Sequence, residues 1–183
     1  MEPLIGKYFD DLESADKDIQ YEAFKNILAE TEKEVDWAYE VWDLLLEWLK
    51  DRDNHRRSRA AQFLSHLAIS DPESRMLNDF SALWEVTKDP KFVTARHALQ
   101  SIWKVGLAGP EQKKLVMNHL VDRFQKSAHE ENYTLIRYDV MEGLKKLFDK
   151  VKDEHIKQTA LDLIETEEEI KYRKKYASIW RNT

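Results

Sequence analysis

The chain has 183 residues, enough for one ordinary domain with a substantial core. Lys and Arg number 29 against 35 Asp and Glu, so the net charge of −6 argues against a protein that binds nucleic acid over a broad basic surface. Cysteine is absent, which excludes disulfides and thiolate sites, and Gly and Pro number only four each, which favours helices joined by short loops over a β-sandwich.

The N-terminal residues and the apolar runs bear on targeting. Residues 1–7 contain no long apolar stretch of the kind found in signal peptides. The apolar run Leu44–Leu46 lies between Asp43 and Glu47, and no run approaches the roughly 20 residues of a membrane-spanning helix. We therefore expect a soluble cytoplasmic protein with no membrane partner.

Apolar spacing and capping signals divide the chain into helices. The predicted helices are 3–13, 17–30, 34–50, 54–69, 72–88, 91–106, 110–127, 133–150, 153–165 and 167–180. Three boundaries rest on a proline suited to the first helical turn, in Asp71-Pro72, Asp89-Pro90 and Gly109-Pro110. Two more are interpreted as capping boxes, Thr31-x-x-Glu34 and Thr166-x-x-Glu169.

The predicted helix 34–50 carries an acidic stripe on an otherwise apolar surface. At about 100° per residue, its four acidic side chains fall within an arc of roughly 60°. They are Asp36, Glu40, Asp43 and Glu47. Because the remaining positions are mostly apolar, we expect the helix to be buried on several sides and to expose only this stripe.

Four predicted helices share a core pattern that repeats along the chain. A small or branched residue is followed by an apolar residue, two further positions and another apolar residue. The four occurrences are Ala23-Phe24 with Ile27, Ala60-Ala61 with Leu64, Ala98-Leu99 with Ile102, and Val140-Met141 with Leu144. Two helices per roughly 40 residues is the spacing of HEAT and armadillo arrays.

The segments 93–102 and 135–144 resemble the first helix of a HEAT repeat. The resemblance implies an all-α, right-handed α-solenoid forming one domain over residues 1–183. Residues 1–15 would be an N-terminal cap, residues 16–165 about four helix pairs, and residues 166–183 a C-terminal cap helix. An irregular helical bundle is the alternative.

In HEAT-like arrays the second helix of each pair lines the concave surface. Carried over to this chain, the resemblance implies a partner-binding face that begins with the acidic stripe and continues along the later helices. The candidate partner-binding residues are Asp36, Glu40, Asp43, Glu47, Arg75, Asn78, Glu85, Lys114, Asn118 and Asp122. The alternative is that these residues simply form solvated helix faces.

No motif in the chain indicates catalysis. There is no Gly-rich phosphate loop and no Gly-x-Ser-x-Gly, and the six histidines lack the spacing of helical metal sites. We therefore expect no catalytic residue, no cofactor and no metal site.

Two hypotheses for function follow. The first is a non-enzymatic scaffold that binds a protein or peptide, with a basic segment favoured by the acidic stripe. The second is a DNA glycosylase of the HEAT-like, alkylation-repair type. The only short segment of this chain that resembles such enzymes is Val41-Trp42-Asp43. The acidic stripe argues against the second, because it would repel phosphates.

Overall fold

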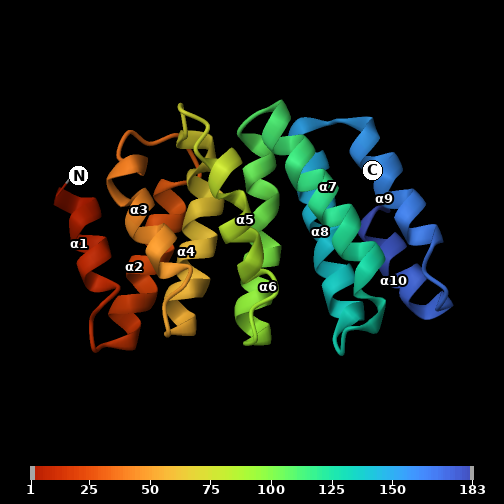
Figure 1. Cartoon of the computed structure of the whole chain (residues 1–183), viewed down its shortest axis with the longest axis horizontal. Helices are drawn as coiled ribbons and strands as arrows, with labels where there is room; N and C mark the ends of the chain where they lie inside the picture. The colour runs from red at the N-terminus through yellow and green to blue at the C-terminus, as the bar shows by residue number, and fades with distance from the viewer. Residues whose placement is uncertain (1–2, 182–183) are drawn as a thin grey trace.

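The computed structural model describes residues 3–181, and every regular element in this range is helical. Figure 1 shows the helices standing side by side, with the two termini at opposite ends of the row. The all-α class expected from the sequence is therefore confirmed. Positions 1–2 and 182–183 of the predicted terminal segments lie outside the described residues.

The described residues form ten α-helices and three short 3₁₀ segments. The α-helices are α1 (Pro3–Asp11), α2 (Lys17–Glu30), α3 (Ala38–Trp48), α4 (Asn54–Leu67), α5 (Met76–Val86), α6 (Phe92–Ser101), α7 (Pro110–Lys126), α8 (Tyr133–Val151), α9 (Glu154–Glu165) and α10 (Ile170–Ile179). The 3₁₀ segments η1 (Ala68–Ser70), η2 (Ile102–Leu107) and η3 (Ser127–His129) continue α4, α6 and α7.

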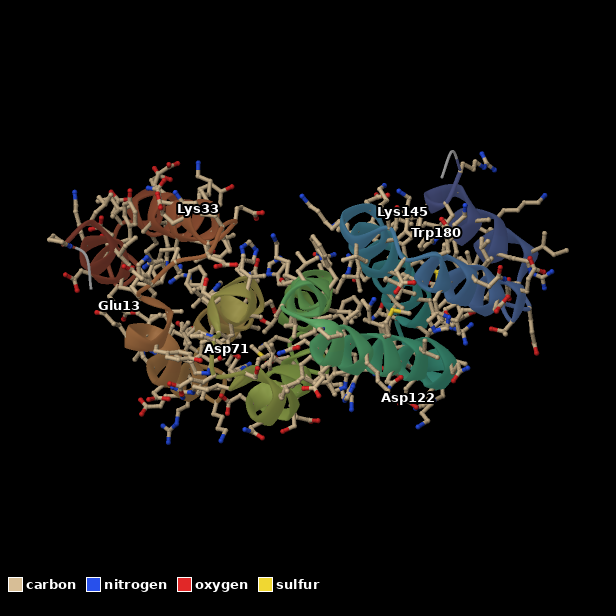
Figure 2. All side chains as sticks on the ribbon, turned by 90° about the horizontal axis from the view of Figure 1, so that it is seen from above. Glu13, Lys33, Asp71, Asp122, Lys145 and Trp180 are labelled. Carbon is tan, nitrogen blue, oxygen red and sulfur yellow. The ribbon has the colours of Figure 1, made fainter. Side chains whose placement is uncertain are left out.

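The helices lie in two layers. Helices α2, α4, α6 and α8 pack against one another in sequence, and α3, α5, α7 and α9 do the same in the second layer. Figure 2, seen from above, shows the two rows one behind the other. Between the layers, α3 packs on α4, α5 packs on both α4 and α6, α7 packs on η2 at the end of α6 and on α8, and α9 packs on α8.

The repeated apolar pattern forms the core between the layers. Ala60, Ala61 and Leu64 on α4 are fully buried, as are Val140 and Leu144 on α8. One cluster of buried side chains runs from Ile5 to Trp180 and so spans both layers and both ends. In the pattern, Phe24 differs, because it is only partly buried at the edge of the core.

Three predicted helix starts are wrong, because polar side chains near them make hydrogen bonds other than the ones predicted. Thr31 ends α2, where its hydroxyl donates to the carbonyl of Ile27 at 2.8 Å, and α3 begins only at Ala38. Thr166 likewise ends α9 by donating to Leu163 at 2.6 Å. Pro72 precedes a turn, and α5 begins at Met76, whose N–H donates to the carboxylate of Asp71 at 2.7 Å.

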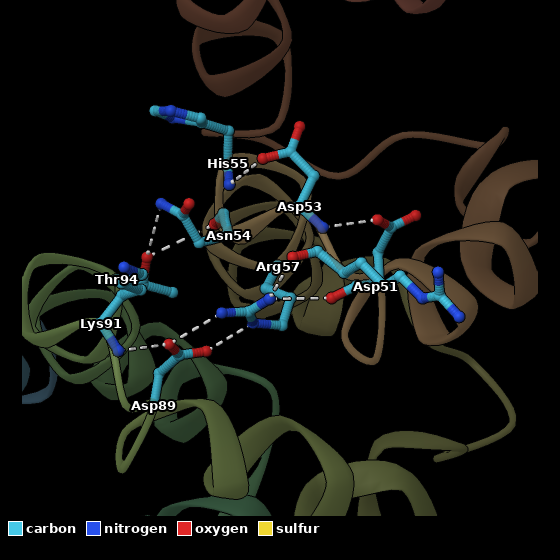
Figure 3. A network of polar contacts seen from close by, with 9 residues as sticks. Asp51, Asp53, Asn54, His55, Arg57, Asp89, Lys91 and Thr94 are labelled. Atoms are coloured by element: carbon cyan, nitrogen blue, oxygen red, sulfur yellow. Dashed lines mark hydrogen bonds and ion pairs between the residues drawn. The ribbon is translucent and has the colours of Figure 1, made fainter.

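Arginine–carboxylate pairs connect successive units. Arg57 on α4 donates to Asp89 at 2.6 and 3.0 Å, and Arg96 on α6 donates to Asp139 at 2.7 and 2.8 Å. The first of these pairs is drawn in Figure 3, where Arg57 reaches from α4 to the loop before α6. Such bidentate pairs fix the relative position of two helices as well as their separation.

The C-terminal helix α10 packs against α8 and α9. Tyr176 is fully buried and Trp180 nearly so, and the Tyr176 hydroxyl donates to the carbonyl of Thr134 at 3.1 Å. Glu167 was expected on this helix but lies buried before it, where it accepts from Arg137 at 2.7 Å. The helix therefore covers the end of the layer that holds α8.

Candidate functional site

Two neighbouring cavities form a groove along the layer of even-numbered helices. The first has a volume of about 450 Å³ and the second about 550 Å³, and they share Gln62 and His97. We call the two together the α4/α6 groove. In Figure 2, Lys33 and Lys145 lie on either side of the groove, and the yellow and green helices α4 and α6 lie set back between them.

Helical spacing places the groove side chains on one face of each helix. The first cavity is lined by Leu12, Glu13, Lys17, Gln20, Tyr21, Phe24, Asp53, His55, Arg56, Arg59, Gln62 and His97. The second is lined by Glu32, Gln62, His66, His97, Gln100, Ser101, Trp103, Lys104, Lys146, Asp149 and Lys150. On α4, positions 59, 62 and 66 are three and four residues apart, which aligns them along the helix.

The carboxylates of the groove are bound to groups of the protein itself. Glu32 accepts from the ammonium of Lys104 at 2.8 and 2.9 Å. Glu13 is paired with Arg56, and Asp149 with Lys145. Asp53 caps α4 by accepting from the N–H of His55 at 2.8 Å. Little negative charge is therefore left without a local partner.

Several cations of the groove have no such partner. Lys17, Lys146 and Lys150 form no ion pair among residues 3–181, and all three are exposed. Arg59 donates to the carbonyl of Leu12 at 3.1 Å and to the amide oxygen of Gln20 at 2.8 Å, both of which are neutral. The groove thus presents positive charge on a protein whose overall charge is −6.

His66 lies in the groove wall as a neutral residue. Its Nδ1 is 3.2 Å from the hydroxyl of Thr31 and 3.6 Å from a carboxylate oxygen of Glu32. Burial, together with the nearby ammonium of Lys104, lowers the pKa of His66 to about 4, although the carboxylate of Glu32 acts in the opposite direction. At neutral pH its contact with Glu32 is therefore not an ion pair.

The candidate residues from the sequence lie on the opposite layer. They belong to α3, α5 and α7 or to the segments before them, and none lines the α4/α6 groove. Asn118 and Asp122 line a smaller hollow of about 240 Å³ beside α9. Their role in partner binding stays a prediction.

The acidic stripe itself is exposed but shorter than expected. Asp36 lies before α3, so only Glu40, Asp43 and Glu47 share the helix. Asp43 is paired with Arg75, whose guanidinium also lies 5.2 Å from the Tyr39 ring centroid and 5.7 Å from that of Trp42. Part of the stripe therefore joins α3 to the start of α5.

No protein-family model matches this chain, and no curated protein matches its sequence.

Within residues 3–181, His, Asp and Glu side chains form no group of three suited to holding a metal ion. No helix in the same range has the length and apolar character needed to cross a membrane.

The α4/α6 groove is the feature of the described chain from which a function is best argued. Its signal in the sequence was the polar series 59, 62 and 66, which repeats at 97, 100 and 104.

Proposed function

We propose that the chain is a cytoplasmic, non-enzymatic HEAT-like module, a right-handed α-solenoid, that binds an extended acidic segment of a partner protein in the α4/α6 groove. The cations of the groove that lack a carboxylate partner carry this proposal. An acidic segment would give Lys17 and Lys146 carboxylate partners, and it would give a further one to Lys150, whose charge already helps to lower the pKa of Glu32.

The packing of the helices supports the repeat assignment, with a different starting point from the one expected. Because α5 and α7 pack on the helices both before and after them, and α3 packs on α4, the contacts allow units that begin with an odd-numbered helix. The even-numbered helices are then the second helices of their units. In HEAT-like arrays these line the concave surface, which agrees with the position of the groove.

The shape of the groove favours an extended polypeptide over a small molecule. Its two cavities follow one another across α2, α4, α6 and α8 rather than forming one enclosed pocket. Stacked helical hairpins typically bind partners along such extended surfaces. The glycosylase alternative is less well supported, since the chain has a net charge of −6 and the groove offers few cations without a carboxylate partner, whereas binding a phosphate backbone needs many clustered Lys and Arg side chains.

The first test measures binding of short labelled peptides by fluorescence anisotropy. An Asp/Glu-rich peptide should bind more tightly than a Lys/Arg-rich peptide of equal length, and its affinity should fall as salt rises from about 50 to 200 mM. The double variant K146E/K150E should weaken acidic-peptide binding by about tenfold or more, because two favourable charge contacts become repulsive.

A matched variant controls for the change in net charge. K171E/K174E alters the same residue type at two exposed positions of α10 outside the groove and should bind the acidic peptide nearly as well as the parent. Equal weakening by both variants would contradict the proposal. Tighter binding of a single-stranded oligonucleotide than of the acidic peptide would favour the nucleic-acid alternative instead.

A further inference from the structure

The first cavity of the groove has an aromatic wall beside its cations. Tyr21 and Phe24 line it from α2, and Arg59 lines it from α4. Tyr21 is 58% exposed, although most large apolar side chains of the chain are buried. The ammonium of Lys25 lies 5.0 Å from the Tyr21 ring centroid on the same helix.

Arg59 offers the anchor for an anion at this wall. Its two hydrogen bonds go to neutral oxygens of Leu12 and Gln20, which hold the guanidinium in place between α1, α2 and α4. Its Nε–H has no hydrogen-bond partner among residues 3–181 and is not a fully buried atom, and the side chain lines the cavity. The carboxylates of Asp53 and Glu13 are near enough to act on the charge of Arg59, but neither accepts a hydrogen bond from it.

We infer that this cavity is the specificity subsite of the groove and takes an aromatic side chain of the bound segment, with a neighbouring carboxylate of that segment on Arg59. The inference rests on the proposed function, because it names the part of the segment that this end of the groove selects. An aromatic ring would cover the exposed Tyr21 and the partly buried Phe24. Aromatic pairs of this kind add to the gain from apolar burial.

The size of the cavity agrees with this occupant. At about 450 Å³ it lies within the range of roughly 300–1,000 Å³ typical of pockets that enclose small organic groups. The second cavity has a different character, since it is lined mainly by lysines, glutamines and histidines with Trp103 nearly buried. The aromatic preference should therefore be confined to the end of the groove beside α2.

The experiment compares two acidic peptides that differ only at one central position, Phe or Ala. The parent protein should bind the Phe peptide about tenfold more tightly, as expected for burial of one aromatic side chain. Tyr21→Ala should remove most of this preference, and Tyr21→Phe should keep it. Ile19→Ala, an exposed apolar position of α2 that does not line the cavity, should leave it unchanged.

A second variant tests the contact between Arg59 and the peptide carboxylate separately from the aromatic contact. Arg59→Gln should weaken both acidic peptides and leave the preference for Phe in place. If both peptides bind equally to the parent, the subsite inference is wrong while the proposed function stands. If neither acidic peptide binds, the proposed function itself fails. A Phe preference that survives Tyr21→Ala would also overturn the assignment of this cavity.

Discussion

At the scale of single residues, buried polar groups connect units that are distant in sequence. Asp139 is fully buried and accepts from Arg96 and Gln100, and Glu167 is buried against Arg137. The apolar pattern of the sequence showed nothing of these polar pairs. Asp89, Asp139 and Glu167 stand at different places in their units, so periodicity could not predict the pairs.

His66 makes stability depend on pH in a predictable direction. Its pKa of about 4 in the folded chain lies below the unfolded value of about 6.5, so the unfolded state binds the proton more strongly. The contribution of neutral His66 to the free energy of unfolding is fully present above about pH 6.5, and it is lost as the pH falls towards 4. By pH 5 the loss should be on the order of 2 kcal/mol.

Urea unfolding at pH 7 and pH 5 measures this contribution. Between the two pH values, the free energy of unfolding should fall by about 2 kcal/mol less in His66→Gln than in the parent, because glutamine binds no proton in this pH range. His129→Gln, which changes an exposed histidine, should behave like the parent. Identical pH dependence in the parent and His66→Gln would show that His66 is not the buried neutral group described above.

At the scale of elements, amphipathic spacing predicted the existence of every helix but not all of their ends. Gly109-Pro110 did mark the start of α7, where proline occupies the first turn. Thr31 and Thr166 failed as starting signals because a threonine hydroxyl can equally bond to a carbonyl at the end of the preceding helix. The choice depends on tertiary packing, which a local pattern does not contain.

Helix α10 should contribute strongly to stability as a cap. Removing residues 170–183 leaves Glu167 with Arg137 but exposes the surface that Tyr176 and Trp180 cover. At about 25 cal/mol per Å² of apolar surface, the loss is several kcal/mol, which corresponds to a fall in Tm of roughly 5–15 °C. Differential scanning calorimetry of the shortened chain measures this fall.

A second truncation distinguishes apolar burial from the ion pair. Ending the chain after Glu165 also removes Glu167 and leaves Arg137 buried without its carboxylate. This chain should melt below the one that ends after Glu169, since an unpaired buried charge costs about 3–5 kcal/mol. Either shortened chain melting within about a degree of the full protein would mean that α10 docks elsewhere rather than capping the array.

At the scale of the whole molecule, the sequence predicted the class of the fold and most of its core, and it placed the candidate partner-binding residues on the layer opposite the α4/α6 groove, where their role stays a prediction. The repeated quartets are buried, apart from Phe24, which is only partly buried. The pairing of helices was assigned from α2 onward, because the core pattern is clearest on the even-numbered helices. The groove instead lies along the even-numbered helices, so we place the start of each unit at an odd-numbered helix.

The most direct test of this account is to locate the bound acidic Phe peptide by NMR. Backbone amide shifts on titration should concentrate on α2, α4, α6 and α8, including Tyr21, Arg59, His97 and Lys146. The segment around Glu40, Asp43 and Glu47 on α3 should show little change. Shifts centred on α3, α5 and α7 would contradict the account and return the binding surface to the layer first predicted from the sequence.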